Sequence, residues 1–168
     1  ELNLLVKIDT NINNYKHQFD LIIICTPLGT YKEIFSSLNK FVSQPTLVTD
    51  VGSTKVSTIQ DFKEQVTNTN IQFLPSHPIA GLEKSGPEYG IANLFENRFC
   101  IITPINKNDP FINEITDMWK KIGMKIEIMD SERHDRVLAM TSHIPQLIAF
   151  SVVTTATELE SHMKDEII

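Results

Sequence analysis

The run Leu21-Ile22-Ile23-Ile24-Cys25 decides the fold of this chain. It is continuously apolar and rich in β-branched side chains, without the polar alternation of a half-exposed strand. Such a run is typical of a strand that is buried on both faces of a parallel sheet. Thr26 and Pro27 end the run, and apolar side chains then recur at helical spacing at Ile34, Leu38 and Phe41.

Short apolar runs and helical patterns alternate over the following hundred or so residues. Further strands are predicted over Thr46–Thr49, Ile71–Leu74, Phe99–Thr103 and Lys125–Met129, and helices over Ser53–Val66 and Pro110–Lys121. Strands that alternate with helices of about a dozen residues indicate βαβ units. We therefore expect an α/β fold with a mostly parallel sheet, in which the first three strands are neighbours.

After Asp130 the pattern changes to one long helix, Ser131 to roughly Glu160, with Asp130 or Ser131 as N-cap. Pro145 lies within it and cannot donate a backbone hydrogen bond, so we expect a kink or break beside His143. The part over 147–156 is apolar or small nearly all round, which favours burial between helices. We expect an α/β domain over residues 1–130 and the first helix of a helical domain over 131–168.

Composition excludes several classes of protein. The chain has 168 residues, of which 41% are hydrophobic, and a net charge of -6. Without a cluster of Lys and Arg, no nucleic-acid partner is expected. Cys25 and Cys100 each fall in a predicted buried strand, so a disulfide is not expected. No leader pattern opens the chain, and Leu21–Cys25 is too short to span a bilayer, so we expect a cytoplasmic protein without a membrane partner.

Three segments carry residues suited to catalysis. The first, Ser76-His77-Pro78-Ile79-Ala80-Gly81-Leu82-Glu83-Lys84, puts a histidine on a Pro- and Gly-framed turn after a predicted strand. The second is Thr49-Asp50-Val51-Gly52-Ser53-Thr54-Lys55, and the third joins Arg133-His134-Asp135 to Ser142-His143-Ile144-Pro145-Gln146. The simpler interpretation of His77 is a surface loop histidine.

In this order, the three segments resemble those of the prephenate/arogenate dehydrogenases of tyrosine biosynthesis, over about residues 20–153. The resemblance implies a partial Rossmann-type sheet followed by the start of a helical dimerisation domain. It also implies an NAD- or NADP-dependent oxidative decarboxylation of prephenate to 4-hydroxyphenylpyruvate, or of arogenate to tyrosine. A homodimer is implied as well. The choices between NAD and NADP, and between prephenate and arogenate, stay open.

The resemblance also indicates what the chain lacks. None of its six glycines falls in a G-x-G-x-x-G spacing, the turn on which these folds hold the pyrophosphate. Compared with the family, Leu21–Cys25 is the fourth strand, and the chain is expected to be truncated at both ends and inactive alone. The arginine that grips the substrate in the family has no counterpart here. Without its central neighbour, the Leu21–Cys25 strand is expected to be an uncovered apolar edge.

The resemblance assigns the chemistry to particular residues. It makes His77 the acceptor of the hydroxyl proton, and Ser53 the residue that orients this hydroxyl and the nicotinamide ribose. Thr26 and Pro27 are implied to contact the cofactor. The alternative for Ser53 is an ordinary N-cap of the helix that follows it.

His143, Glu83 and Lys84 are implied to bind substrate or close the site. For His143 the alternative is a core histidine bonded to the carbonyl that Pro145 leaves free, and Glu83 and Lys84 could equally be solvated. Leu82 stands where the family usually has threonine. The Arg133-His134-Asp135 segment is interpreted as capping or interdomain contacts.

Three other interpretations stay open at this stage. One is a non-catalytic remnant whose helical end only pairs with another subunit, and another is a different Rossmann-type dehydrogenase acting on a hydroxy acid. A zinc site built from His77, His134 and His143 lacks the close ligand spacing of known sites, so no metal is expected.

Overall fold

The computed structural model describes residues 10–12, 19–81 and 86–165. Its elements alternate as the sequence predicts. They are, in chain order, β1 (Leu21–Ile24), α1 (Tyr31–Phe41), β2 (Thr46–Asp50), α2 (Val56–Gln65), β3 (Ile71–Phe73), β4 (Ser76–Pro78), β5 (Phe99–Ile102), α3 (Ile112–Lys121), β6 (Lys125–Ile128), α4 (Ser131–Leu138) and α5 (Ile144–Asp165). Short 3-10 turns cover Leu28–Thr30 and Pro87–Tyr89.

The first three strands form one parallel sheet in the order β1-β2-β3. Leu21 pairs with Leu47, and Thr46 pairs with Ile71, so all three strands run in the same direction. The predicted neighbours and their parallel arrangement are therefore confirmed. β2 is the central strand, and all five of its residues are buried.

A second sheet has the order β4-β5-β6, and here one expectation is wrong. His77 was expected on a turn, but it lies in β4, which pairs antiparallel with β5, with His77 opposite Ile101. Pro75 has no N–H, so the ladder with β2 cannot continue through it, and the chain passes from β3 to the edge of β5. β5 and β6 are parallel.

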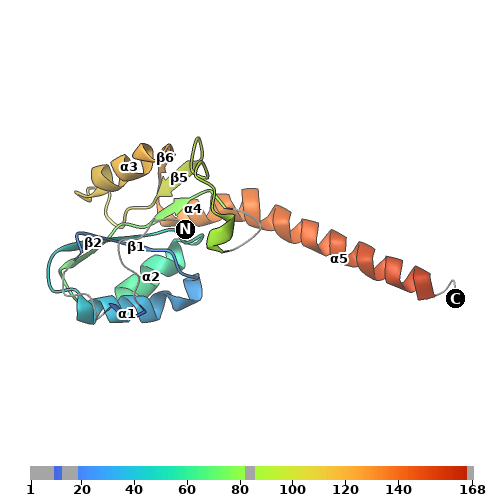
Figure 1. Cartoon of the computed structure of the whole chain (residues 1–168), viewed down its shortest axis with the longest axis horizontal. Helices are drawn as coiled ribbons and strands as arrows, with labels where there is room; N and C mark the ends of the chain where they lie inside the picture. The colour runs from blue at the N-terminus through green and yellow to red at the C-terminus, as the bar shows by residue number, and fades with distance from the viewer. Residues whose placement is uncertain (1–9, 13–18, 82–85, 166–168) are drawn as a thin grey trace.

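Adjacent residues of β2 face two separate hydrophobic cores. Val48 belongs to the core built with α1, whereas Leu47 belongs to the core that contains Trp119 of α3. This follows from the alternation of side chains along a strand. In Figure 1, α1 and α2 lie below the strands and α3 lies above them, as in a doubly wound fold.

Among the described residues, β1 is the edge of its sheet. Ile23 is 41% exposed, so this edge carries apolar surface, as expected. Burial on both faces, predicted for the whole run, is not found: of its residues only Ile24 is buried, and Cys25 is exposed directly after the strand. Cys100 is buried in β5, and neither cysteine forms a disulfide.

The long helix begins at Ser131, as predicted, and Asp130 is its N-cap, accepting a hydrogen bond from the Arg133 N–H at 2.8 Å. The expected break near Pro145 takes the form of a π-helical turn over Ala139–His143, which joins α4 to α5 without interrupting the helix. The Ile144 N–H bonds the Ala139 carbonyl across this turn. A widened turn of this kind removes the clash that Pro145 would cause in a regular helix.

Beyond the π turn, α5 projects away from the α/β body (Figure 1). Its apolar side chains are exposed within this chain, including Leu147 at 67% and Phe150 at 62%. The prediction that this segment is buried between helices is therefore wrong for the chain by itself. The helix over Ser131–Ser161 is long and apolar enough to cross a membrane by length and composition alone.

Candidate functional site

His77 lies at one end of a chain of hydrogen-bonded side chains. It is half-buried in β4, and its Nδ1 lies 2.9 Å from Nε2 of His134 in α4. The second histidine is completely buried. The sequence interpretation of His134 as a capping residue missed this contact, which joins residues 57 positions apart.

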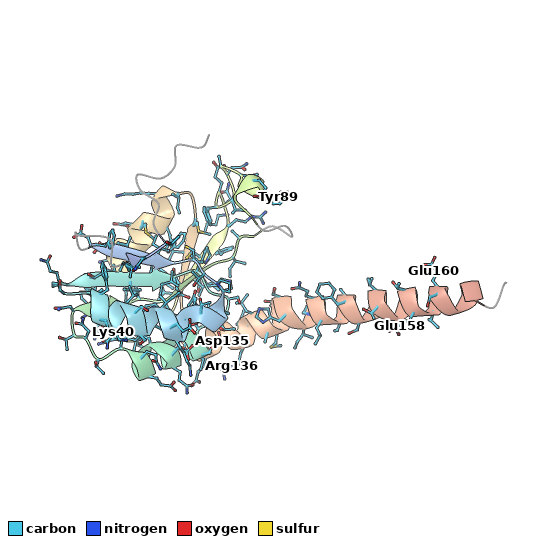
Figure 2. All side chains as sticks on the ribbon, turned by 60° about the horizontal axis from the view of Figure 1, so that its bottom comes forward. Lys40, Tyr89, Asp135, Arg136, Glu158 and Glu160 are labelled. Atoms are coloured by element: carbon cyan, nitrogen blue, oxygen red, sulfur yellow. The ribbon has the colours of Figure 1, made fainter. Side chains whose placement is uncertain are left out.

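Asp135 completes the chain and ties α4 to α2. Its Oδ1 lies 2.7 Å from Nδ1 of His134, and its carboxylate accepts the backbone N–H groups of Lys55 at 2.8 Å and Val56 at 3.0 Å. A carboxylate at the first N–H groups of a helix is a favourable cap. The predicted capping role is thus confirmed for Asp135, whose side chain lies at the base of the long helix in Figure 2, whereas an interdomain contact stays a prediction.

This cap also corrects the alternative proposed for Ser53. The predicted helix over Ser53–Val66 begins only at Val56, with Lys55 as N-cap, because the carboxylate of Asp135 binds the N–H groups there. Ser53 is exposed in the turn after β2, and its side chain makes no hydrogen bond to another described residue. An ordinary N-cap role for Ser53 is therefore excluded.

A buried ion pair lies beneath the His77 strand. Lys55 and Asp50 both have fully buried side chains, and their Nζ and Oδ2 atoms are 2.6 Å apart. The same ammonium donates to the Ser76 carbonyl at 2.8 Å. Asp50 in turn accepts the N–H of Gly52 at 2.9 Å and that of Ser76 at 3.1 Å. The pair therefore fixes the turn after β2 against the residue that precedes His77.

Burial keeps both histidines neutral, and for His77 nearby positive charges add to its effect. Burial lowers the pKa of His77 to about 3, and the charges of Lys55, His134 and His143 act in the same direction. Burial also lowers the pKa of His134, although Asp135 opposes this shift. For Lys55, burial lowers the pKa despite its contact with Asp50. At neutral pH, His77 is an uncharged imidazole.

The hydrogen bonds of Asp135 keep it ionised. Burial by itself raises the pKa of Asp135, but the backbone N–H groups of Val56 and Lys55 and the ring of His134 outweigh it, and the net shift is downward. A carboxylate that accepts several N–H groups stays negatively charged. Asp135 is therefore an acceptor for the Nδ1–H of His134.

The other expected site residues lie around this centre. His143 is exposed in the π turn, close enough for its charge to lower the pKa of His77. Thr26 and Pro27 are exposed at the carboxyl end of β1, where the Thr30 hydroxyl lies 2.9 Å from Thr26 Oγ1. Glu83 and Lys84 fall outside the described residues, as does Leu82. Whether Ser53, His77 and His143 face one cleft stays a prediction.

Sequence reasoning missed the burial of Lys55 and the contact of His134 with His77. A charged side chain in a turn and a histidine in the first turn of a helix both indicate surface positions. One signal was present for Lys55: Asp50 precedes it by five residues in the same quoted segment.

In the part of the chain that the structure describes, no group of three or more His, Cys, Asp or Glu side chains is arranged to hold a metal ion.

Comparisons with known proteins agree on one family. Residues 1–128 match the family model described as prephenate dehydrogenase, nucleotide-binding domain, and residues 130–167 match prephenate dehydrogenase, dimerization domain. Among curated proteins, the chain is similar to the cyclohexadienyl dehydrogenase of Zymomonas mobilis, with 33% identity over 99% of this chain and 56% of that protein. It is also similar to the prephenate dehydrogenase of Bacillus subtilis, with 35% identity over 79% of this chain and 36% of that one.

A solved structure extends this likeness to three dimensions. The prephenate dehydrogenase of Aquifex aeolicus, determined in complex with hydroxyphenyl propionate and NAD+, matches with a TM-score of 0.73 and 36% identity, over 81% of this chain and 47% of that one. The chain thus spans between 36% and 56% of the length of these relatives. With family models matching nearly all of its residues, the chain belongs to the prephenate dehydrogenase family.

Proposed function

We propose that this chain supplies the catalytic base and part of the cofactor site of a prephenate or arogenate dehydrogenase. The observation that carries the proposal is the neutral, half-buried His77, held by His134 and Asp135 and placed over the Lys55–Asp50 pair. Family membership supplies the reaction class, and the geometry supplies the residue suited to it. We further propose a domain boundary near Asp130.

His77 would take the proton of the substrate's ring hydroxyl. When bound, NAD(P)+ accepts the hydride from the carbon that bears this hydroxyl, while the ring carboxylate leaves as CO2 and the ring becomes aromatic. The hydroxyl becomes acidic as the hydride departs, and a neutral imidazole within hydrogen-bond reach accepts its proton. Such general-base assistance contributes roughly 10²–10⁴-fold to the rate. A pKa of about 3 keeps His77 unprotonated before the reaction at every ordinary assay pH.

The residues at the ends of β1 and β2 suit the nicotinamide half of the cofactor. Thr26 and Pro27 are exposed at the carboxyl end of β1, and Ser53 is exposed after β2. In open α/β sheets, dinucleotides bind at this edge of parallel strands. The hydroxyl groups would bind the ribose and the Pro27 ring would pack near the nicotinamide. No G-x-G-x-x-G turn occurs in these 168 residues, so the pyrophosphate must be held by other residues.

His143 is proposed to bind substrate from the long helix, together with Glu83 and Lys84. Support for His143 comes from its electrostatic effect on His77. A hydrogen-bond donor on this side of His77 suits a substrate with carboxylates.

The test is steady-state kinetics on a chimaera. The 168-residue chain would carry the remaining segments of the Zymomonas mobilis relative, which aligns with 99% of it. We expect cofactor reduction with prephenate or arogenate, and a loss of about 10²–10⁴-fold in kcat in His77→Asn. Arg136→Gln, an exposed change on α4, is the control. Undiminished turnover in His77→Asn would refute the proposed role.

A homodimer through α5 is the second part of the proposal. Two observations support it: the match of residues 130–167 to a dimerization domain and the exposed apolar surface of α5. An exposed apolar surface of this extent marks an interaction site. A second copy of the chain would cover Leu147 and Phe150, whereas a membrane is the competing partner. A cytoplasmic location stays a prediction.

Sedimentation and vesicle flotation separate these two partners. We expect the chain to sediment as a dimer, and Leu147→Glu with Phe150→Glu to shift it to monomer. Glu158→Gln, at the far end of α5 (Figure 2), is the control. Flotation of the unmodified chain with phosphatidylcholine and phosphatidylglycerol vesicles, without self-association, would refute the dimer.

A further inference from the structure

The imidazoles of His77 and His134 share a hydrogen bond, and Asp135 fixes which of the two rings donates it. A bond between His77 Nδ1 and His134 Nε2 at 2.9 Å needs a proton on one of these nitrogens. The other nitrogen of His134 lies 2.7 Å from the carboxylate of Asp135. A carboxylate only accepts hydrogen bonds, so His134 Nδ1 must carry a proton.

Because His134 is fully buried and its pKa is lowered, it holds only this one proton. Its Nε2 is then a bare acceptor, and the shared proton belongs to Nδ1 of His77. A neutral imidazole with its proton on Nδ1 has an unprotonated Nε2. The ring of His77 is therefore left with an acceptor at the nitrogen that faces away from His134.

We propose that His134, anchored by Asp135, is the positioning residue that holds His77 in the Nδ1–H tautomer and so makes its Nε2 the atom that receives the substrate proton. The statement that the substrate's ring hydroxyl gives this proton rests on the proposed function. The tautomer itself depends only on the contacts in this chain. Second partners of this kind orient a ring and fix its tautomer in many histidine sites.

Asp135 gives this arrangement its rigidity. Both of its oxygens are engaged, Oδ1 by His134 and the Lys55 N–H, and Oδ2 by the Val56 N–H. The carboxylate therefore cannot rotate away from His134 without exposing the first N–H groups of α2. Asp135 and His134 are adjacent in α4. The helix and the contact of Asp135 with the start of α2 therefore together set the position of the His134 ring.

The charged groups around the pair act in opposite directions, with Asp135 favouring a proton on His77 as well, and burial decides the outcome. Lys55 and His143 both disfavour a proton on His77, and Lys55 also disfavours one on His134. Asp50 and Asp135 favour a charged His134, but its burial outweighs them. If His134 were cationic, it would donate from Nε2, and His77 would be forced into the opposite tautomer. The buried, neutral state is the one that leaves an acceptor toward the substrate.

Nitrogen NMR of the 168-residue chain tests the tautomer directly. With ¹⁵N-labelled histidine, two-bond correlation spectra distinguish protonated from bare ring nitrogens. We expect His77 to be protonated at Nδ1 and bare at Nε2, and this pattern to change in His134→Phe. In His134→Gln, the amide oxygen can still accept, so the pattern should be retained. Arg136→Gln on the same helix should leave it unchanged.

A wild-type spectrum with His77 protonated at Nε2 would overturn the inference. So would an unaltered His77 pattern in a folded His134→Phe variant. If that variant does not fold, the wild-type and His134→Gln spectra still decide the question, because the tautomer is read in both.

Kinetics in the chimaera separate this inference from the proposed function. We expect His134→Phe to lower kcat by about 10–100-fold with little change in KM, and His134→Gln to recover part of the loss. Full turnover in His77→Asn, together with the expected spectra, would refute the function and leave the tautomer standing. If His77→Asn loses turnover but the nitrogen spectrum of His77 does not change in His134→Phe, the inference about the tautomer is refuted and the proposed function stands.

Discussion

Replacing Lys55 by methionine would remove the ammonium of the buried pair and keep most of the side-chain volume. Asp50 would lose the shortest of its hydrogen bonds, at 2.6 Å, and the Ser76 carbonyl would lose the bond at 2.8 Å. Removing one partner of a buried pair typically costs about 3–5 kcal/mol. Three donors to Asp50 remain, the N–H groups of Gly52 and Ser76 and the hydroxyl of Tyr31. We therefore expect a loss near the lower end, about 3 kcal/mol.

Urea unfolding followed by tryptophan fluorescence suits this measurement. The single tryptophan, Trp119, is buried and donates to Ser76 Oγ at 3.2 Å, so it reports from beside the altered pair. Circular dichroism should give the same midpoint if unfolding is two-state. Lys63→Met, the same change at an exposed position of α2, should alter the free energy of unfolding by no more than about 0.5 kcal/mol.

A double-mutant cycle with Asp50→Asn isolates the pair. The doubly substituted chain carries no uncompensated buried charge, so its loss of stability should be smaller than the sum of the two single losses by about 2 kcal/mol. The cation also lowers the pKa of His77, so this pKa should rise in Lys55→Met. A loss below about 1 kcal/mol, or additive single losses, would mean that the pair does not hold this turn.

Three further predictions concern pH, packing and activity. His77 has a pKa of about 3 when folded against 6.5 when unfolded. The unfolded chain therefore binds the extra proton, and the free energy of unfolding should fall by about 2 kcal/mol from pH 7 to pH 5, less so in His77→Asn. In Gly52→Ala, the added Cβ would meet Asp50 Oδ2 at 2.8 Å, so the free energy of unfolding measured in urea should fall by about 1–3 kcal/mol. Gly29→Ala, where the added Cβ meets open space, should not lower it. The 168-residue chain alone should reduce no NAD(P)+ with prephenate or arogenate in an absorbance assay, because it has no glycine-rich phosphate turn.

The parallel strands and the long helix could be predicted because their signals are local. Runs such as Leu21–Cys25 and the N-cap at Asp130 depend on neighbouring residues, and the structure reproduces them within a few positions. The start of α2 could not be predicted from Ser53, because a carboxylate 80 residues away from Lys55 caps that helix. A tertiary cap leaves no trace in the local pattern. Similarly, Pro78 and Gly81 indicated a turn around His77, where pairing with the distant strand β5 produces a strand instead.

The candidate site was only half visible in the sequence. His77 and Ser53 were singled out by the turns predicted around them and by the family resemblance, but His134 was assigned to capping. A histidine in the first turn of a helix gives no sign of what its ring contacts, since the partner depends on how α4 docks against β4. The burial of Lys55 was hidden for a similar reason: only the fold brings Asp50 and the Ser76 carbonyl to its ammonium.

These contacts also bear on where the two parts of the chain divide. The sequence puts the boundary near Asp130, where the pattern changes to one long helix. Yet α4 contributes His134 and Asp135, whose bonds go to β4 and to the start of α2, so α4 packs as part of the α/β body. Val137 of α4 is 39% exposed, but the large exposures of apolar side chains on the long helix begin with Met140 in the π turn, at 72%, and continue along α5. With the domain boundary proposed near Asp130, α4 is thus the part of the long helix that contacts the candidate site, and we infer that the part left for a partner begins at the π turn over Ala139–His143.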